Sequence, residues 1–390
     1  MKKTKALFAL FVACMMILSA CGNSNTPSDG GSSSEGSVVR IGGIGPLTSD
    51  YANYGLSVRN GAQIAVDEIN AAGGVNGMTF ELDFQDSVAD ADQAVAAYGK
   101  LLDNGMHVSI GTVLSGEMAS VSKVGAEDDI FMISPSASAD KAIEQNDKAF
   151  RVCFKDSDQG TFSADYIHDH NMATEVAVLY QSDIDYSIGL FEAFEKRAQE
   201  LGIKIVEVQT FDSNTNTDFT TQVSALSLSG AKVIFIPIYA AEASVFLSQA
   251  KGKIADDVLY FGCDGLDGIL SKVENDVSLA DNVMELTPFS ADDTDPDVQK
   301  FVTEYKTRFN ATPDQFAADG YDAVYVIKAI IEKANITKPE DCSGTLMAQT
   351  ITTITVEGIT GTMTWTADGN TVKDAKAMII QDGVASLYQG

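Results

Sequence analysis

The sequence predicts an α/β protein of two doubly wound lobes, each with a parallel sheet covered by helices on both faces. Three observations support this fold class. The chain has 390 residues, of which 45% are hydrophobic, and this is more than one ordinary compact domain needs. Apolar segments of strand length alternate with helical patterns along most of the chain, which is typical of parallel sheets. The alternation breaks near residues 150–160 and then resumes, which indicates a second lobe.

The elements expected in the first lobe begin with a buried strand over residues 38–44. A helix follows, because Val58, Ala62, Ala65 and Ile69 recur at helical spacing. We expect this helix to stop at the glycine pair 73–74, since glycine readily takes the left-handed conformation of a helix cap. Further strands are predicted at 80–86, 107–113 and 130–136, with helices in the intervals between them.

The second lobe repeats the alternation of strands and helices. Strands are predicted at 175–180, 202–208, 232–238 and 257–262, each followed by a helical stretch. The C-terminal part differs, because Asp295 followed by Pro296 predicts a helix start, and longer helices are expected over 316–333 and from Ser343. The chain is expected to end in hairpin-like segments at 358–370 and 376–383.

The first 37 residues have the pattern of an export signal followed by a tether. Lys2, Lys3 and Lys5 precede an apolar run from 6 to 20, which is shorter than a membrane-spanning helix. Leu18-Ser19-Ala20-Cys21 resembles a bacterial lipobox, which implies cleavage after residue 20 and a lipid on Cys21. An ordinary signal peptide with a cysteine at its cleavage site is the alternative. Residues 21–37 then form a polar linker rich in glycine and serine, and a tether of this length spans about 20 to 25 Å.

The charge of the chain excludes nucleic acid as a partner. It carries 26 basic and 55 acidic residues, a formal net charge of -29, which repels a phosphate backbone. Of the five cysteines, Cys14 and Cys21 belong to the signal region, so Cys153, Cys263 and Cys342 remain. They have no metal-binding spacing, and we expect three separate buried thiols, with one disulfide as an open alternative.

The familiar enzyme signatures that we sought are not matched in the sequence. Residues 43–48 approach the dinucleotide fingerprint, but Thr48 replaces its third glycine and Pro46 has no N–H to offer a phosphate. His168 and His170 lie two positions apart at a predicted helix end, which favours a solvated terminus over a metal site. We therefore expect no enzyme activity, no catalytic residues, no cofactor and no metal. A lipid-anchored hydrolase is disfavoured because we recognise no catalytic nucleophile with an accompanying general base in the sequence.

Small hydroxyl residues follow two neighbouring predicted strands of the first lobe. Ser115 follows the strand at 107–113, and Ser136 and Ser138 follow the strand near 130–134. Either set alone could serve as a helix cap, but together they form a carboxylate cradle at the edge where parallel sheets bind ligands. In the second lobe, Asp264 follows the strand at 257–262 and Tyr239 ends the strand at 232–238. An acid opposite a hydroxyl cradle matches the polarity of a zwitterionic amino acid.

These features resemble those of the branched-chain amino acid binding proteins, the Leu/Ile/Val-type substrate-binding subunits of ABC transporters. The resemblance covers residues 38–390 and rests on the order and spacing of short motifs. These motifs are Ile41–Thr48, Tyr54-Gly55, Asn70–Gly77, Gly111–Ser115, Met132–Ser138, Gln159-Gly160, Gly262–Gly265 and Gly358–Gly369.

The resemblance implies a type I periplasmic-binding-protein-like fold, in which three hinge crossings join the two lobes. We place the crossings near 155–158, 287–290 and 361–364. The expected N-terminal lobe is then residues 38–156 and 288–362, and the expected C-terminal lobe is residues 157–287 and 363–390.

The resemblance also implies roles for seven residues. The ligand-binding residues carried over by position are Tyr54, Ser115, Ser136, Ser138, Tyr186, Tyr239 and Asp264. The hydroxyls of Ser115 and Ser138, with backbone groups at Ser136, would hold the ligand carboxylate, and Asp264 would pair with its ammonium. The three tyrosines would surround its side chain. The chain departs from the family at Ser138, at Leu266 and around Tyr186, which affects side-chain specificity more than recognition of the amino acid backbone.

The implied function is capture of an amino acid between the lobes and its delivery to the membrane subunits of an ABC importer. We expect a monomer, held outside the cell on the outer face of the cytoplasmic membrane by lipid at Cys21. A tethered receptor that senses a small amino acid, amide or carboxylate is the alternative, and it would need a separate signalling partner.

Overall fold

The computed structural model describes residues 37–371, 373 and 375–388. The expected signal peptide at 1–20, the lipidation site at Cys21 and nearly all of the linker at 21–37 lie outside the described residues. Within the described part of the chain, no helix combines the length and the apolar character that a membrane crossing requires.

The first lobe is built on a five-stranded parallel sheet with strand order β2-β1-β3-β4-β5. Its strands are β1 (Val38–Gly45), β2 (Thr79–Asp86), β3 (Val108–Thr112), β4 (Phe131–Ser134) and β5 (Ala149–Arg151). The crossover helices are α1 (Ala52–Ala71), α2 (Ala91–Asp103) and α3 (Ser115–Val124). Alternation along β1 explains the two covered faces, because Val39 and Ile41 pack with α1 whereas Ile44 packs with α2 and α3.

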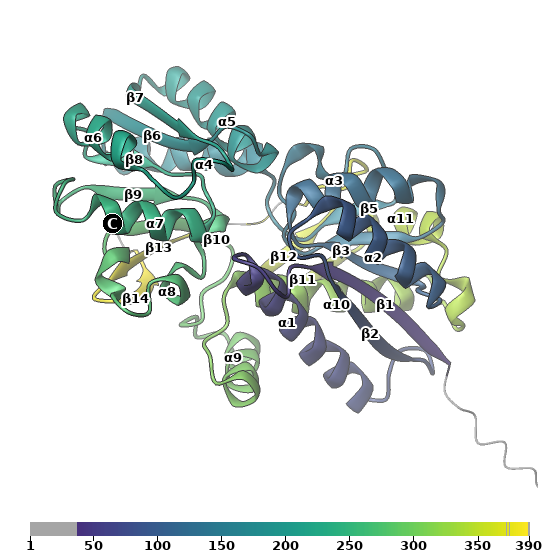
Figure 1. The fold of residues 1–390 in the computed structure, drawn as a ribbon. Coiled ribbons are helices and arrows are strands. Elements are labelled where there is room, and N and C mark those ends of the chain that lie inside the picture. The colour runs from purple at the N-terminus through teal and green to yellow at the C-terminus, as the bar shows by residue number, and fades with distance from the viewer. Residues whose placement is uncertain (1–36, 372, 374, 389–390) are drawn as a thin grey trace, which may run out of the picture. The chain divides into compact units, whose positions relative to one another are not determined.

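Three later helices and a hairpin complete the first lobe. They are α9 (Pro296–Phe309), α10 (Gln315–Lys333), α11 (Gly344–Ile351), β11 (Thr355–Gly358) and β12 (Gly361–Thr364). Helix α10 lies along α1 (Figure 1), and glycines permit this close approach, because a side chain at Gly61 would collide with the carbonyl of Ala317. The predicted start of α9 is confirmed, since Asp295 caps the helix by accepting a hydrogen bond from Asp297 N at 2.8 Å.

The second lobe is built on a seven-stranded sheet with strand order β14-β13-β10-β9-β8-β6-β7. The parallel strands are β6 (Glu175–Gln181), β7 (Lys204–Phe211), β8 (Val233–Phe235), β9 (Leu259–Gly262) and β10 (Val283–Thr287). Strands β13 (Lys376–Gln381) and β14 (Val384–Leu387) add an antiparallel edge. The helices are α4 (Asp156–Asp169), α5 (Asp185–Leu201), α6 (Thr220–Ser229), α7 (Ala240–Ala250) and α8 (Ile269–Lys272). Helices α4 and α5 cover one face, and α6 and α7 cover the other (Figure 1).

The predicted fold class of two doubly wound lobes is confirmed. The short strand β5 was not predicted, and β7 extends to Phe211, three residues beyond the predicted end. Cys153, Cys263 and Cys342 are buried free thiols.

The strands also limit where the chain can pass between the lobes. It leaves the first sheet after Arg151, leaves the second sheet after Thr287 and returns to it at Lys376. Strand β12 occupies residues 361–364 and pairs with β11, and Trp365 forms a bridge to Thr371. The hinge positions near 155–158, 287–290 and 361–364 stay predictions.

Candidate functional site

The predicted ligand residues gather where loops after the carboxyl ends of both sheets meet. A pocket is lined by Tyr54, Val113, Leu114, Ser136, Ser138, Tyr186, Tyr239, Asp264, Gly265 and Phe316. All the predicted residues except Ser115 are among them, and Ser115 directly follows the lining residue Leu114. The free space inside is about 10 Å³, close to the room that a single water needs. The pocket therefore needs to open before an amino acid can enter.

On the first-lobe side, serine hydroxyls tie the loops after β3 and β4 together. Ser134 Oγ donates to Thr112 O at 2.8 Å, and Ser136 Oγ donates to Val113 O at 2.9 Å. Ser115 Oγ accepts a hydrogen bond from Ala139 N at 3.1 Å. These bonds fix the shape of the cradle, so the serines hold the loops as well as facing the pocket.

The N-terminus of α3 opens beside this cradle. Its N-cap is Leu114, which lines the pocket and has no side chain able to accept a hydrogen bond from the first turn. The first N–H groups of a helix have no partner within the helix, and the helix dipole favours an anion there. The arrangement suits a carboxylate without a basic side chain.

On the second-lobe side, Asp264 is 5% exposed and accepts two hydrogen bonds at Oδ1. The donors are the hydroxyl of Tyr186 and the backbone N–H of Gly265, each at 2.9 Å. Burial raises the pKa of Asp264 to about 6, although the hydrogen bond from Tyr186 acts in the opposite direction. Asp264 forms no ion pair with any described residue. A desolvated carboxylate of this kind is stabilised by a cation brought by the ligand.

Asp156 lies near Asp264 and was not predicted as part of the site. It is fully buried, and neither of its carboxyl oxygens has a hydrogen-bond partner among the described residues. Burial and then the charge of Asp264 raise the pKa of Asp156 well above its ordinary range. The buried guanidinium of Arg151 acts in the opposite direction and donates to the carbonyls of Ala137 and Ser138, beneath the cradle.

Tyr54 connects the two lobes directly across the pocket. Its hydroxyl donates to Gly265 O at 2.7 Å and accepts a hydrogen bond from Ala240 N at 2.9 Å. Its ring contacts Phe316 with centroids 4.7 Å apart, and Tyr186 stacks on Tyr239 at 4.5 Å with an angle of 4° between the rings. The pocket therefore has aromatic walls from both lobes.

Four of the pocket-lining residues were not predicted, namely Val113, Leu114, Gly265 and Phe316. The first three belong to segments already singled out and could have been included, since they adjoin Ser115 or Asp264. Phe316 starts a helix almost 200 residues further along, and its apolar character fits an ordinary core position equally well. Tertiary packing alone brings it to the pocket.

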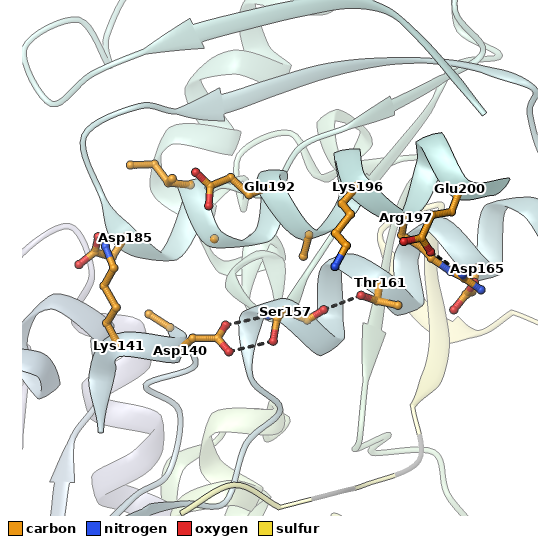
Figure 2. Close-up of a pocket in the computed structure, with 14 residues that line it drawn as sticks. Asp140, Lys141, Ser157, Thr161, Asp165, Asp185, Glu192, Lys196, Arg197 and Glu200 are labelled. Carbon is orange, nitrogen blue, oxygen red and sulfur yellow. Dashed lines mark hydrogen bonds and ion pairs between the residues drawn. The ribbon is translucent and has the colours of Figure 1, made fainter. Parts of the chain in front are cut away.

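A larger groove lies beside α4 and α5 and holds none of the predicted ligand residues. It has a volume of about 630 Å³, and Figure 2 shows charged side chains of both signs along it. Lys141 pairs there with Asp185 at 3.1 Å, with 69% and 43% of their side chains exposed. Exposed pairs of this kind contribute little to stability, and water reaches them freely. This groove is a solvated surface rather than a site that encloses a ligand.

Comparison with known proteins gives one family match over most of the chain. The family described as periplasmic binding protein matches residues 38–383. The Leu/Ile/Val-binding protein homolog 3 of Brucella melitensis is 30% identical over 339 residues, which span 85% of this chain and 88% of that protein. The leucine-, isoleucine-, valine-, threonine-, and alanine-binding protein of Pseudomonas aeruginosa is 28% identical over 320 residues, or 82% and 84% of the two chains.

Solved structures agree with this match. The branched-chain amino acid transporter substrate-binding protein LivJ of Streptococcus pneumoniae, in complex with isoleucine, has a TM-score of 0.81 and 28% identity. That similarity covers 90% of this chain and 99% of the other. A solute-binding protein of R. palustris in complex with benzoate has a TM-score of 0.79 at 18% identity, with 90% and 95% covered, and shows the fold alone.

Proposed function

This chain belongs to the periplasmic binding protein family, and from that premise we propose that it captures an amino acid between its lobes and delivers it to an ABC importer. The solute that we propose is a branched-chain amino acid, which agrees with the names of the relatives and with the isoleucine bound in the similar structure. The protein acts by binding, and no bond is made or broken.

The observation that carries this proposal is the buried carboxylate of Asp264 opposite the α3 N-terminus. Asp264 has hydrogen-bond donors around it but no cation among the described residues, so a ligand ammonium completes its environment. The helix N-terminus and the serine loops offer hydrogen-bond donors to the ligand carboxylate. The tyrosine rings and Phe316 give the pocket apolar walls that an aliphatic side chain can contact once the pocket opens.

The proposed mechanism is hinge closure. Tyr54 already bonds to backbone groups of both Gly265 and Ala240 in the second lobe, and the space inside the pocket is about 10 Å³. Ligand entry therefore requires the lobes to separate. A ligand that contacts both lobes has a higher affinity for the closed arrangement and shifts the population toward it. The closed form is the one that the importer recognises.

An aromatic acid such as benzoate fits this pocket less well than an amino acid. Benzoate has no ammonium group, so closure around it would leave the Asp264 carboxylate buried without a cation. Asp264 would then take up a proton, since burial has already raised its pKa.

The test is calorimetric titration of the full-length protein with leucine, isoleucine, valine, alanine, threonine and benzoate. We expect saturable binding of at least one aliphatic amino acid and none of benzoate. X-ray scattering with and without that amino acid should show a smaller radius of gyration in the complex. Binding of benzoate in preference to every amino acid, or an unchanged radius at saturation, would contradict the proposal.

The proposed location is outside the cell, on the outer face of the cytoplasmic membrane, with lipid at Cys21 as the anchor and with a monomeric soluble part. This rests on the lipobox at residues 18–21 and on the family. Replacement Cys21→Ala should leave an uncleaved precursor without lipid, which metabolic labelling with a fatty acid and a mass measurement would detect. Normal processing and membrane retention of this variant would disprove the anchor.

A further inference from the structure

A second cavity of about 520 Å³ lies apart from the ligand pocket. We propose that it binds an organic cation with an apolar body, such as an alkylammonium ion. This cavity, called the acidic cavity below, contains Asp267 of the second lobe and Asp314 of the first lobe, together with Glu285 on β10. The proposal goes beyond amino acid capture, because it concerns other residues and a ligand of different charge.

The two aspartates stand on either side of the junction between the lobes. Asp267 Oδ2 accepts a hydrogen bond from Gln315 N at 2.7 Å, which joins the segment after β9 to the start of α10. Asp314 caps α10, because its Oδ1 accepts from Ala317 N at 2.9 Å, and its Oδ2 accepts from the hydroxyl of Ser57 at 2.7 Å. These donors hold both carboxyl groups in fixed positions.

Glu285 is the independent observation that points to a ligand. It is 8% exposed and lines the acidic cavity, and its Oε2 is buried without a hydrogen-bond partner in the described part of the chain. Strand pairing shows which way the Glu285 side chain points. Glu285 lies opposite Met378 on β13, and both residues line the cavity. The alternate residues Met284 and Leu286 pack into the core on the other face of the sheet. A buried polar group without a partner is costly, so a donor inside the cavity would stabilise it.

The basic side chains near the cavity form no ion pair with its acids. Lys373 pairs with Asp319 at 3.2 Å, and Lys376 pairs with Asp293 at 2.6 Å. Lys306 lines the cavity but is exposed to solvent, and it pairs with none of Asp267, Asp314 and Glu285 in the described part of the chain. A cation from outside the protein would therefore neutralise these acids. In the described residues no group of acidic, histidine and cysteine side chains has the arrangement of a metal site, which favours an organic cation.

The remaining walls define the rest of the ligand. Leu266, Leu270, Phe289, Met378 and Ile380 line the same cavity as the acids. Apolar walls with a few convergent charged groups are typical of small-molecule sites. A primary ammonium group can donate three hydrogen bonds to carboxylates, and an alkyl or cycloalkyl body fits against these side chains.

Binding of a cation should also release protons. Burial, followed by the charge of Asp314, raises the pKa of Asp267 to about 7, and burial and the charge of Asp267 raise that of Glu285. The other titratable groups nearby are Asp264, Asp292, Asp319, Tyr305 and Lys306. A cation lowers the pKa of a neighbouring carboxyl group, so protons held at pH 7 are displaced as it binds.

The experiment is calorimetric titration of the full-length protein with hexylammonium chloride, with hexan-1-ol as the uncharged probe of the same length. We expect saturable binding of the amine and none of the alcohol. Glu285→Gln should weaken amine binding about ten- to hundredfold, since it removes a charged hydrogen-bond partner. Titration at pH 7 in phosphate and in Tris, which differ in ionisation enthalpy, should show proton release that is reduced in this variant.

Two further variants locate the site. Asp264→Asn, in the amino acid pocket, should weaken amine binding less than Glu285→Gln does, although its charge acts on Glu285. Asp267→Asn provides a second test within the cavity if Glu285→Gln does not fold. Circular dichroism establishes that each variant is folded. Absence of saturable amine binding, or equal binding of hexan-1-ol, would overturn the proposal. So would loss of amine binding in Asp264→Asn, because the amine would then occupy the amino acid pocket.

Discussion

The two sides of the amino acid pocket use different chemistry. The first-lobe side presents an uncapped helix N-terminus and serine hydroxyls that are hydrogen-bonded to neighbouring backbone groups. The second-lobe side presents one buried carboxylate, Asp264, and a stacked pair of tyrosines. The proposed recognition of the ligand is neutral and spread over many groups on the first side, whereas on the second side it is charged and concentrated in one residue.

This difference indicates how each side should respond to mutation. The negative charge of Asp264 has no cation partner among the described residues, so the ligand ammonium is its expected partner. Removal of this charge therefore removes one strong interaction with the ligand. A cradle of hydroxyl and backbone groups loses only part of its donors when one serine is replaced. The predictions below test this asymmetry between the sides.

The largest effect is expected from Asp264→Ala. The closed pocket would then hold a ligand ammonium without a counter-charge, which costs about 2 to 5 kcal/mol, or roughly 30-fold to several-thousand-fold in affinity. Calorimetric titration with the amino acid that binds the wild type measures this loss, and Asp264→Asn separates the charge from the side-chain volume. An affinity for Asp264→Ala equal to that of the wild type would place the ammonium elsewhere.

A smaller effect is expected from Ser115→Ala on the first-lobe side. The change removes a hydroxyl that is expected to bond the ligand carboxylate and that also accepts the N–H of Ala139. Loss of a hydrogen bond to a charged group costs about 1.5 to 3 kcal/mol in affinity. Ser120→Ala on the same helix is the matched control, because Ser120 Oγ donates to Gly116 O within α3. If Ser115→Ala weakened binding more than Asp264→Ala, the asymmetry between the sides would be reversed.

Tyr54→Phe tests the contact between the sides rather than either side alone. It keeps the aromatic ring but removes the hydroxyl that bonds Gly265 O and Ala240 N. Those groups bond water when the lobes are apart, so only the net value of two hydrogen bonds is lost, about 1 to 2 kcal/mol. Titration should show an affinity reduced roughly five- to thirtyfold.

Tyr98→Phe controls for removal of a tyrosine hydroxyl in general. Tyr98 on α2 donates its hydroxyl to Asp128 at 2.9 Å, and neither residue lines the pocket. Equal losses of affinity in the two variants would show that Tyr54 has no special part in closure.

Features of the fold and the site that depend on neighbouring residues could be predicted from the sequence, whereas features that depend on residues far apart along the chain could not. The end of a strand can be predicted from a short segment, because an apolar run is followed directly by small or polar residues. Ser136, Ser138 and Asp264 were found in this way. Tyr239 was found by the same reasoning. The resemblance to a family then contributed Tyr54 and Tyr186.

Features made by long-range packing were missed. Asp267 and Asp314 approach each other across the junction of the lobes, although each alone is an unremarkable acid next to a turn. Arg151 ends the unpredicted short strand β5, and Asp156 begins α4 after it, so nothing in the local pattern placed Arg151 beneath the cradle or Asp156 near Asp264. The hydrogen bond from Ala139 N to Ser115 likewise depends on how two loops pack.

The smallest expected change in affinity is that caused by pH, and it distinguishes the two sides of the pocket most clearly. Burial raises the pKa of Asp264 to about 6, whereas serine hydroxyls and backbone N–H groups do not titrate near neutrality. The ammonium binds the ionised carboxylate, so affinity should fall as pH decreases through 6, roughly fourfold between pH 7 and pH 5.5. Burial and the charge of Asp264 also raise the pKa of Asp156 well above its ordinary range.

The stability of the unliganded protein should change with pH in the opposite direction. The unliganded folded state holds the Asp264 proton more tightly than the unfolded chain does, so this group favours folding increasingly as pH falls from above 6 toward 4. Asp264→Asn should remove the affinity trend and only the part of the stability trend that Asp264 contributes, because Asp267 and Glu285 also have raised pKa values. Titrations and thermal melts at several pH values would measure both. A wild-type affinity independent of pH in this range would mean that the second side does not recognise its ligand through an ionised Asp264.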